Sequence, residues 1–459
     1  MITIRRRGNS MGKVRTRVAV IGAGPCGLVS TKSLSEQGLD VTCFEMSSCV
    51  GGHWKLDNPN GRSAAYESLT TNTTKKMSRL SDYEMPADWP ELPTHEHMYR
   101  WWCDYVEKFG FAECIQLSHL VQKIEPMAND TWCVHWIYED CPQSASFDAV
   151  VLASGGYWSP NVPELPGIFS GDVIHARAYR SPSRPIETTG KRVLVIGSSN
   201  TGCELALEIS KALADRVILS ARSGNWILPK YIDTAEGRQL IASGVPLSHP
   251  CDEVPVLLRK LPASWRERLF GTIGKFAMRN QFGEHAKRLT QAGLPPPPKN
   301  PFAKRPAIAD GLSEALEQGS ISAQGAIVSV DNQQVTFASG ATETIDVIIY
   351  ATGYRLSYPY LDQSVLNTND DDMVLYRGLM HPQHHSLFVA GVSRPSGGFW
   401  PIAEVQAQFI AKLLSGQYEL PSQSVIDKTS MSVLKRDSFN PALYGLSLRE
   451  ELARGAQRI

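Results

Sequence analysis

Residues 17–45 read RVAVIGAGPCGLVSTKSLSEQGLDVTCFE, and this stretch decides the fold. A β-branched apolar run from Val18 to Ile21 leads into a glycine turn at residues 22–27. A helical pattern then continues to Gln37, and a second apolar run ends in Glu45. A strand, a glycine turn, a helix and a second strand closed by an acid, within about 30 residues, form the pattern of a Rossmann dinucleotide-binding unit. The sequence therefore predicts that the chain is organised around a dinucleotide.

Each part of this unit has a physical role. Gly22 makes the tight turn, Gly24 lets the backbone approach a pyrophosphate, and Gly27 lets the helix pack closely on the strand. The free N–H groups at the helix N-terminus attract the phosphates. Glu45 is placed to accept hydrogen bonds from a ribose. A purely structural glycine turn is the alternative, and the complete strand–turn–helix–strand context makes it the weaker one.

Length, charge and cysteine content limit the possible functions. A chain of 459 residues predicts two or three domains. Its 46 basic residues balance 46 acidic ones, which argues against a dominant nucleic-acid or anionic-membrane role and leaves a local basic pocket possible.

The nine cysteines show no CxxC and no metal-ligand spacing, so free thiols in a reducing cytoplasm are expected, with no disulfide framework and no metal site. No apolar run is long enough to span a membrane, and the basic start, with Met1 or Met11 as first residue, lacks a secretory signal.

The chain repeats its opening pattern further on. The strand Arg192–Ile196 leads into GSSNTG at residues 197–202, a helical stretch follows, and the next strand ends in Arg222 instead of an acid. An arginine at this place suits a 2′-phosphate, so this unit should prefer NADPH over NADH. Ser199 stands where Gly24 stands in the first unit and leaves less room. A degenerate structural repeat is the alternative interpretation.

Other segments complete the predicted organisation. His95–Phe109 carries an apolar stripe at helical spacing, which we interpret as core, and residues 131–138 alternate as in an antiparallel meander. The run Pro295–Pro298 predicts a stiff linker or a surface excursion, and the segment after Gly416 has no distinctive composition. Proline-rich linkers flank the second unit.

The fold class follows from these patterns. We predict an α/β protein with two Rossmann-like dinucleotide-binding domains, the second inserted into the first. The predicted division assigns residues 1–183 and 319–459 to the two parts of the first dinucleotide-binding domain and residues 184–318 to an NADPH-binding domain with a helical insertion.

The two glycine turns, the strand end at 351–354 and the linker sequence at 169–179 resemble motifs of the flavin-containing monooxygenase family of class B flavoprotein monooxygenases. The resemblance implies that the domain formed by residues 1–183 and 319–459 binds FAD. GAGPCG at 22–27 resembles the family's FAD site, and GSSNTG at 197–202 resembles its NADPH site. ATGY at 351–354 is similar to its ATG(F/Y) strand end. TNTTK at 71–75 and PIAEVQAQ at 401–408 are also similar in position and content. The family's identifying sequence FxGxxxHxxx(Y/F) is matched by Phe169, Gly171, His175 and Tyr179. The resemblance extends from about Arg17 to Gly416 and is loosest over 224–312.

The resemblance implies a reaction. NADPH would reduce FAD, reduced flavin would capture O2 as a C4a-hydroperoxide, and a soft nucleophile, the N or S of a small organic substrate, would take the oxygen. The protein would not supply a nucleophile of its own. It would place the nicotinamide against the flavin and keep water out of the site. Asn72 corresponds to the family's active-site asparagine, with a loop asparagine in an Asx turn as the alternative. His175 is interpreted as a structural tie between the domains instead of a proton shuttle.

The cofactor contacts follow from the same motifs. The predicted cofactor-binding residues, for FAD and NADPH, are Gly22, Gly24, Pro25, Cys26, Gly27, Glu45, Gly52, Trp54, Thr71, Gly197, Ser198, Ser199, Asn200, Thr201, Gly202, Arg222, Thr352, Gly353 and Gln406.

Several alternatives to this function stay open. Baeyer–Villiger members of the class usually have tryptophan at the Tyr179 position, followed by Pro or Asp, whereas Arg180 follows here, so N- or S-oxygenation is favoured over ester formation. An amino-acid N-hydroxylase, a reductase or oxidase without substrate oxygenation, and a non-catalytic sensor are further alternatives; a disulfide reductase would need a CxxC. The expected partners are an amine or sulfide and O2, without nucleic acid; a homodimer is one option. No hydrophobic anchor follows Gly416, so we expect a cytoplasmic protein.

Overall fold

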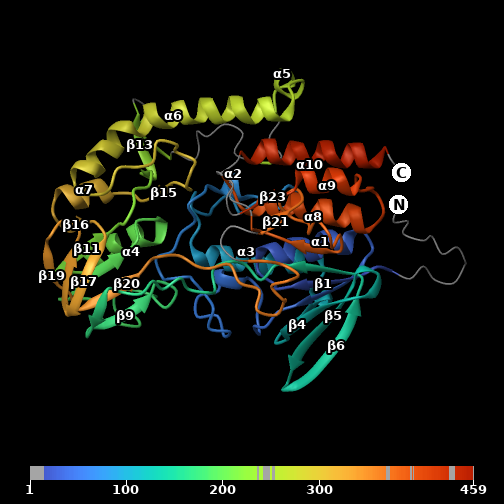
Figure 1. Ribbon diagram of the computed structural model, residues 1–459, viewed down its shortest axis with the longest axis horizontal. Coiled ribbons are helices and arrows are strands. Elements are labelled where there is room, and N and C mark those ends of the chain that lie inside the picture. The colour runs from blue at the N-terminus through green and yellow to red at the C-terminus, as the bar shows by residue number, and fades with distance from the viewer. Residues whose placement is uncertain are drawn as a thin grey trace, which may run out of the picture.

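The computed structural model describes residues 15–234, 237–240, 249–250, 254–368, 373–392, 395, 397–433 and 440–457. Met1, Met11 and Cys251 lie outside these ranges, so the prediction about the start of the chain stays a prediction. The described chain forms two α/β units, with the second at the left of Figure 1 and the first at the right.

The first unit is a parallel five-stranded sheet. Its strands, in spatial order, are β22 (Leu387–Val389), β7 (Ala149–Leu152), β1 (Arg17–Ile21), β2 (Asp40–Phe44) and β3 (Ile115–Gln116). The helices α1 (Pro25–Glu36), α3 (His95–Phe109) and α8 (Trp400–Leu414) pack together on one face. An antiparallel sheet covers the other face with β4 (Leu120–Met127), β5 (Thr131–Tyr138) and β6 (Cys141–Phe147), which confirms the predicted meander. Because both faces are covered, β7 is buried at all four residues.

The second unit repeats this construction. Its parallel strands, in spatial order, are β16 (Ile321–Gln324), β11 (Arg216–Ser220), β10 (Arg192–Ile196), β20 (Val347–Tyr350) and β9 (Asp172–His175). One face packs on α4 (Asn200–Lys211) and α7 (Leu312–Glu317), and the other on β17 (Ile327–Asn332), β18 (Gln334–Phe337) and β19 (Thr342–Thr344), which continue into β8 (Gly167–Phe169). Two Rossmann-like units, the second inserted before β22 and α8 complete the first, confirm the predicted fold class.

The second sheet extends beyond the predicted domain boundaries. The strand β9 precedes residue 184, and both β16 and β20 follow residue 318, yet all three pair into this sheet. The pairing of β9 with β20 leaves no local signal in the sequence, because the two strands are about 170 residues apart in the chain. We therefore propose residues 167–353 as the inserted unit.

The helix α3 shows why local pattern was sufficient in the first unit. Thr94 caps its start by accepting a hydrogen bond from the His97 N–H at 3.4 Å, and Gly110 ends it in the left-handed conformation. Its bounds are those predicted. The stripe residues Met98, Trp101, Trp102 and Tyr105 are almost completely buried, which confirms that the stripe is core.

The remaining elements lie mostly in the insertion and at the C-terminal end. They are α2 (Lys75–Ser78), β12 (Ile227–Leu228), β13 (Tyr231–Thr234), β14 (Gly237–Leu240), α5 (Val256–Arg259), α6 (Ala263–Gln291), β15 (Ala307–Ile308), β21 (Val374–Leu375), α9 (Gln423–Thr429), β23 (Met431–Ser432) and α10 (Pro441–Ala456). Figure 1 shows the long α6 bridging from the second unit to a position above α10. The C-terminal segment, unremarkable in composition, thus contributes a helix that packs on α8 and α6.

The proline run lies partly at the surface and packs on the second unit with its other side. The indole N–H of Trp226 donates to the Pro298 carbonyl at 2.9 Å, and a side chain at Gly224 would lie 1.9 Å from the Pro296 carbonyl oxygen. The run therefore returns from α6 and packs against the segment that follows β11.

Candidate active site

The first glycine turn leaves its backbone open at one position. A Cβ at Gly22 would lie 2.8 Å from the Ala153 carbonyl oxygen, and one at Gly27 would lie 1.7 Å from the Gly22 carbonyl oxygen, so the fold itself requires both glycines. A Cβ at Gly24 would meet only the Gly52 Cα, at 3.7 Å. The protein's own packing does not require Gly24. A bare backbone at a helix N-terminus, with no close contact at the glycine, fits a bound pyrophosphate.

Glu45 fastens the loops around this turn. Its two carboxylate oxygens accept hydrogen bonds from the Ala23 and Ser47 N–H groups, each at 2.8 Å. Burial raises the pKa of Glu45, and these two backbone donors oppose that shift. The carboxylate has lone pairs beyond these two bonds, which is compatible with the predicted contact to a ribose.

The Gly-Gly-His-Trp segment faces the turn from the other side. The Gly51 N–H donates to the Ala23 carbonyl at 2.9 Å, and Gly52 begins a short 3₁₀ turn that contains Trp54. The Trp54 indole nitrogen is buried without a hydrogen-bond partner among the described residues. An unsatisfied buried donor costs about 1–3 kcal/mol, so a ligand that accepts from Trp54 fits this place.

The other two predicted cofactor-binding residues of the first turn, Pro25 and Cys26, have apolar side chains. Pro25 occupies the first turn of α1, where the missing N–H costs nothing. Burial raises the pKa of Cys26 to about 12, so its thiol is neutral and is not a nucleophile. Cys26 packs on Gly391, where an added Cβ would lie 2.4 Å from the sulfur.

The second glycine turn has the same geometry as the first. A Cβ at Gly197 would lie 2.4 Å from the Ala351 carbonyl oxygen, and one at Gly202 would lie 1.8 Å from the Gly197 carbonyl oxygen. Ser199 precedes the first residue of α4 with an extended backbone. The Asn200 side-chain oxygen accepts from the Ile308 N–H at 2.7 Å and so holds β15, and Thr201 is half-buried. The matching backbone contacts support a dinucleotide unit over a merely degenerate repeat.

Two positive charges lie just after the second strand of the second unit, where the sequence predicts a contact with a 2′-phosphate. Arg222 follows the end of β11 and is exposed. The Lys304 ammonium donates to the Ser223 hydroxyl at 2.8 Å and brings a second cation next to Arg222. Lys304 is a residue that sequence reasoning missed, because it is about 80 residues from Ser223 in the chain.

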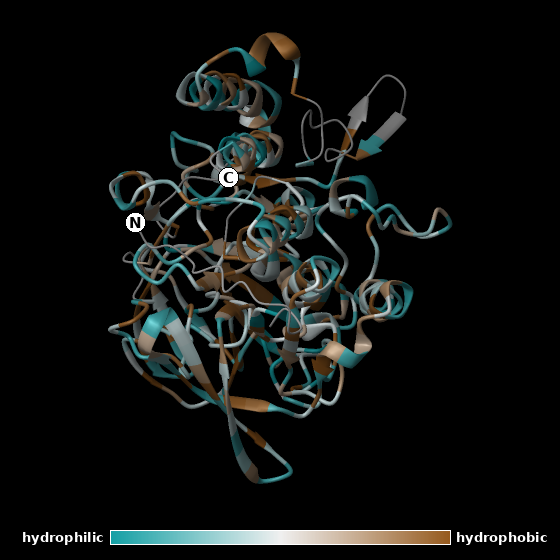
Figure 2. Ribbon diagram, turned by 90° about the vertical axis from the view of Figure 1, so that its right-hand side faces the viewer, coloured by the Kyte–Doolittle hydropathy of each residue, from teal (hydrophilic) through white to brown (hydrophobic). Residues whose placement is uncertain are grey.

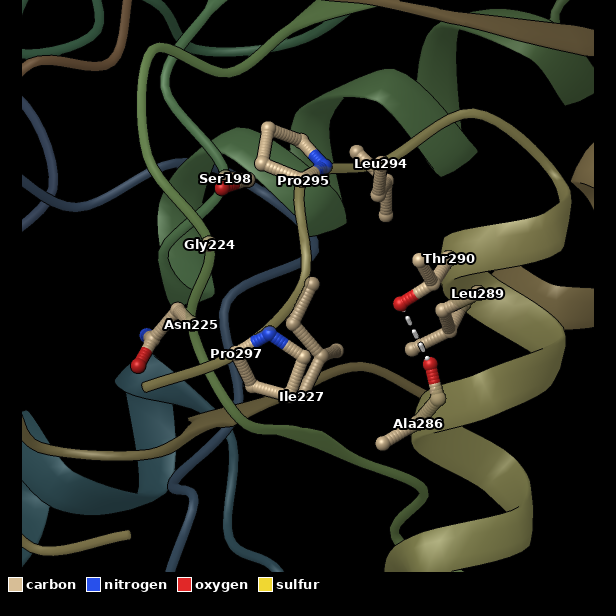
Figure 3. Close-up of a pocket in the computed structure, with 10 residues that line it drawn as sticks. All are labelled: Ser198, Gly224, Asn225, Ile227, Ala286, Leu289, Thr290, Leu294, Pro295 and Pro297. Carbon is tan, nitrogen blue, oxygen red and sulfur yellow. Dashed lines mark hydrogen bonds between the residues drawn. The ribbon is translucent and has the colours of Figure 1, made fainter. Parts of the chain in front are cut away.

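A pocket lies beside the second turn (Figure 3). It is bounded by the turn itself, by the segment after β11, by the end of α6 and by the proline run. The lining residues are Ser198, Gly224, Asn225, Ile227, Ala286, Leu289, Thr290, Leu294, Pro295 and Pro297. The helical insertion therefore supplies one wall of the second dinucleotide unit.

Asn72 presents an unsatisfied acceptor. Its loop is fixed on both sides: the Thr71 N–H donates to the Pro93 carbonyl at 2.9 Å, and Thr74 caps α2 by accepting from the Met77 N–H at 3.3 Å. The Asn72 side-chain oxygen is buried and has no hydrogen-bond partner in the described part of the chain. An Asx turn would satisfy this oxygen with a backbone N–H, so the Asx-turn alternative is wrong. The site fits a ligand that donates a hydrogen bond here.

A buried polar cluster connects this loop with the second unit. The Tyr66 hydroxyl donates to the Glu204 carboxylate on α4, and the Lys230 ammonium lies 3.4 Å from the same carboxylate. Lys230 also donates to the Thr70 hydroxyl at 3.1 Å. Burial raises the pKa of Glu204, and Lys230 opposes the shift. We call Tyr66, Thr70, Glu204 and Lys230 the inter-unit clamp.

The linker motif serves the second sheet. One ring nitrogen of His175 donates to the Gly353 carbonyl at 2.9 Å, and the other accepts from the Arg177 N–H at 3.1 Å. Burial lowers the pKa of His175, which keeps the ring neutral. With both nitrogens engaged by backbone, His175 ties β9 to the end of β20. This agrees with a structural role, but the tie lies within the second unit and not between the two domains as predicted.

The other linker residues pack around this tie. A Cβ at Gly171 would lie 2.4 Å from the Asp346 carbonyl oxygen, and Phe169 lies directly over Gly171. The Tyr179 hydroxyl donates to Glu208 on α4 at 3.2 Å. The motif therefore closes β9 onto β20 and onto α4.

Two further predicted residues have protein partners. The Thr352 hydroxyl donates to the Asn161 carbonyl at 2.5 Å. Gln406 is fully buried on α8, where it accepts from the Gly391 N–H at 3.3 Å and donates to the Tyr444 hydroxyl at 3.0 Å. Contact of these residues with a cofactor stays a prediction.

The described residues also bear on metal sites and membrane-spanning helices. No group of His, Cys, Asp and Glu side chains that could hold a metal ion occurs in the described ranges. Of the helices in the described residues, none is long and apolar enough to cross a membrane.

Comparison with known proteins identifies the family. The sequence profile of the flavin-binding monooxygenase-like family matches residues 15–450. Dimethylaniline monooxygenase [N-oxide-forming] 2 of Macaca mulatta is 30% identical over 449 residues, which cover 95% of this chain and 79% of that protein. Flavin-containing monooxygenase 5 of Rattus norvegicus is 32% identical over 466 residues, covering 96% and 82% respectively.

Solved structures share the fold. S-allyl-L-cysteine S-oxygenase from Allium sativum superposes with a TM-score of 0.68 at 21% identity, covering 96% of this chain and 89% of that one. An oxidised steroid monooxygenase bound to NADP superposes with a TM-score of 0.69 at 19% identity, covering 96% and 99%. Two glycine turns of equal geometry, the linker between them and these matches lead to one conclusion: the chain belongs to the flavin-binding monooxygenase-like family and is an FAD- and NADPH-dependent monooxygenase.

Proposed function

We propose that this protein oxygenates the nitrogen or sulfur of a small organic substrate, using NADPH and O2. The observation that carries the proposal is the buried, unsatisfied Asn72 side-chain oxygen on a loop that the inter-unit clamp holds against the NADPH unit. Relatives that form N-oxides of dimethylaniline and a fold neighbour that oxygenates S-allyl-L-cysteine support this substrate class. FAD reduced by NADPH would supply the oxygen-transferring chemistry through its C4a-hydroperoxide.

The protein's own groups bind, orient and exclude water. The first turn and Trp54 hold the FAD pyrophosphate region, and Arg222 with Lys304 holds the 2′-phosphate of NADPH. Asn72 accepts a hydrogen bond from the flavin or the nicotinamide amide, and as an amide it does not titrate. His175 stays neutral and fixed by backbone, so no proton transfer is assigned to it.

The test compares oxygenated product with released peroxide. Purified protein is supplied with NADPH, O2 and either a tertiary amine or a thioether, and NADPH oxidation, product and H2O2 are measured together. Asn72→Leu removes the acceptor and should leave NADPH oxidation within about threefold while product falls about tenfold or more and H2O2 rises in its place, as expected for a hydrogen bond of about 1.5 kcal/mol. Wild-type protein that releases all its reducing equivalents as H2O2 with both substrates would overturn the proposal.

The choice of nicotinamide is tested separately. Arg222→Gln removes a charge-assisted contact of about 1.5–3 kcal/mol, so the KM for NADPH should rise about 10- to 100-fold. NADH lacks the 2′-phosphate and serves as the internal control, because its KM should not change. An equal rise for both would show that Arg222 does not read the 2′-phosphate.

A further inference from the structure

Asn225 carries a buried side-chain oxygen that the described part of the chain does not satisfy. The oxygen is shielded from solvent and has no hydrogen-bond partner among the described residues. The interior of the protein is mainly apolar, and Figure 2 shows hydrophobic strands at the centre of the molecule. A buried acceptor without a partner costs about 1–3 kcal/mol. A ligand that donates a hydrogen bond to Asn225 would remove this cost.

The hydrogen bond that Asn225 does form determines which atom of its amide is free. The side-chain nitrogen donates to the Arg305 carbonyl at 3.2 Å. A carbonyl oxygen only accepts, so the opposite orientation of the amide would set two acceptors against each other. The free atom of Asn225 is therefore the oxygen, and its missing partner is a donor.

Asn225 faces the cations that are predicted to bind the 2′-phosphate. Arg222 comes directly before Ser223, whose hydroxyl accepts from the Lys304 ammonium at 2.8 Å. The next residue after Lys304 is Arg305, whose carbonyl accepts from Asn225. Both Ser223 and Asn225 thus bond to one short segment, and the free oxygen lies on the side of these positive charges.

The other side of the Asn225 segment is closed by protein. Gly224 faces the proline run, since a Cβ there would lie 1.9 Å from the Pro296 carbonyl oxygen. Figure 3 shows the Asn225 side chain turned away from α6, Pro295 and Pro297. A ligand therefore approaches Asn225 from the side on which Arg222 lies.

NADPH, on which the chain depends, brings a suitable donor to this place. Phosphate oxygens only accept hydrogen bonds, whereas adenine carries a 6-amino group, and the amide of asparagine is well suited to adenine. We propose that the Asn225 side-chain oxygen accepts a hydrogen bond from the 6-amino group of the NADPH adenine. Asn225 then selects adenine over 6-oxo purines, while Arg222 and Lys304 hold the 2′-phosphate of the same nucleoside. The proposal does not depend on the proposed oxygenation reaction.

The binding of two oxidised dinucleotides to the FAD-loaded protein tests the proposal without turnover. The first is NADP⁺, and the second is its hypoxanthine analogue, in which a 6-oxo group replaces the 6-amino group and the ribose hydroxyls and 2′-phosphate are unchanged. In isothermal titration calorimetry, wild-type protein should bind NADP⁺ about tenfold or more tightly, because the analogue sets an acceptor against Asn225. Equal affinities would overturn the proposal and would make a ribose hydroxyl the donor.

Asn225→Leu tests whether this residue carries the preference. Leucine has a similar size and no acceptor, so the affinity for NADP⁺ should fall about tenfold, and the two dinucleotides should bind almost equally. Arg222→Gln is the matched control. It should weaken both dinucleotides by the same factor and keep the preference, since both carry the 2′-phosphate. An unchanged preference in Asn225→Leu would overturn the proposal.

Asn225→Asp separates ligand recognition from a structural role of Asn225. This variant also loses the hydrogen bond to the Arg305 carbonyl, but it keeps an acceptor. The preference for NADP⁺ should therefore persist in Asn225→Asp and disappear in Asn225→Leu, with the flavin absorbance showing that both variants are folded. A preference lost equally in both variants would show that only the bond to Arg305 matters, and would overturn the proposal.

Discussion

Two glycines of the first turn differ in whether the protein's own packing leaves room for a side chain. Gly27 is required by the fold, because a Cβ there would lie 1.7 Å from the Gly22 carbonyl oxygen, whereas a Cβ at Gly24 would make only an ordinary contact with the Gly52 Cα, at 3.7 Å. Gly27→Ala should therefore destabilise the protein by about 3 kcal/mol or more, as overpacking against backbone does. Gly24→Ala should change the stability of the apoprotein by less than about 1 kcal/mol.

The cofactor separates these two glycines further. Gly24→Ala places a methyl group where the pyrophosphate would approach, so the folded variant should purify colourless. Denaturation midpoints and the flavin absorbance of the two variants give the measurement. A yellow Gly24→Ala protein would contradict the assignment of the pyrophosphate to this turn.

His175 gives the protein a pH-dependent contribution to stability. Burial lowers its pKa in the folded protein below the ordinary 6.5, so as pH falls the unfolded chain takes up a proton before the folded chain does. The contribution of His175 is complete above about pH 6.5 and is lost as pH falls toward the folded pKa. His175→Gln, which can still donate to the Gly353 carbonyl, should make the loss of stability between neutral and mildly acid pH less steep. Identical slopes for the two proteins in denaturant titrations would show that His175 accepts a proton without loss of its contacts.

At the scale of elements, the inter-unit clamp joins the Asn72 loop to α4. Lys230 and Glu204 are both mostly buried, so Lys230→Met leaves a buried carboxylate without its cation and should cost about 3 kcal/mol. Adding Glu204→Gln removes that unpaired charge and should restore more than half of the loss. Urea midpoints of the single and double variants measure the coupling. A double variant as unstable as the sum of its parts would show that the clamp is not a charge pair.

The sequence predicted the elements that local residues determine, but not the contacts between residues far apart in the chain. Both glycine turns and α3 were predictable, because strand, turn, helix and cap signals lie within about 30 neighbouring residues. Lys304 beside Ser223 and Tyr66 beside Glu204 were not, since each contact closes a long loop that leaves no local signal. The same reason applies to β9, whose partner β20 could not be assigned from the sequence.

For the whole molecule, the C-terminal helix is the largest part that composition did not predict. On α10, Leu448 is buried, the Tyr444 hydroxyl donates to the Arg377 carbonyl at 2.9 Å, and Glu451 accepts from the Tyr418 hydroxyl at 2.9 Å. A protein that ends before residue 440 keeps every nucleotide motif but uncovers α8. It should lose several kcal/mol of stability and much of its soluble yield. An unchanged urea midpoint would show that α10 is only an appendage.

The inserted arrangement of the two sheets fixes the order in which they are finished during synthesis. The last strand of the second sheet, β20, ends at Tyr350, whereas β22 and α8, which complete the first sheet, end only at Val389 and Leu414. At a synthesis rate of about 5–20 residues per second, the second unit has all its strands several seconds before the first. The unit that begins the chain is therefore the last to close, and its nucleotide site matures only after the inserted unit has all its strands.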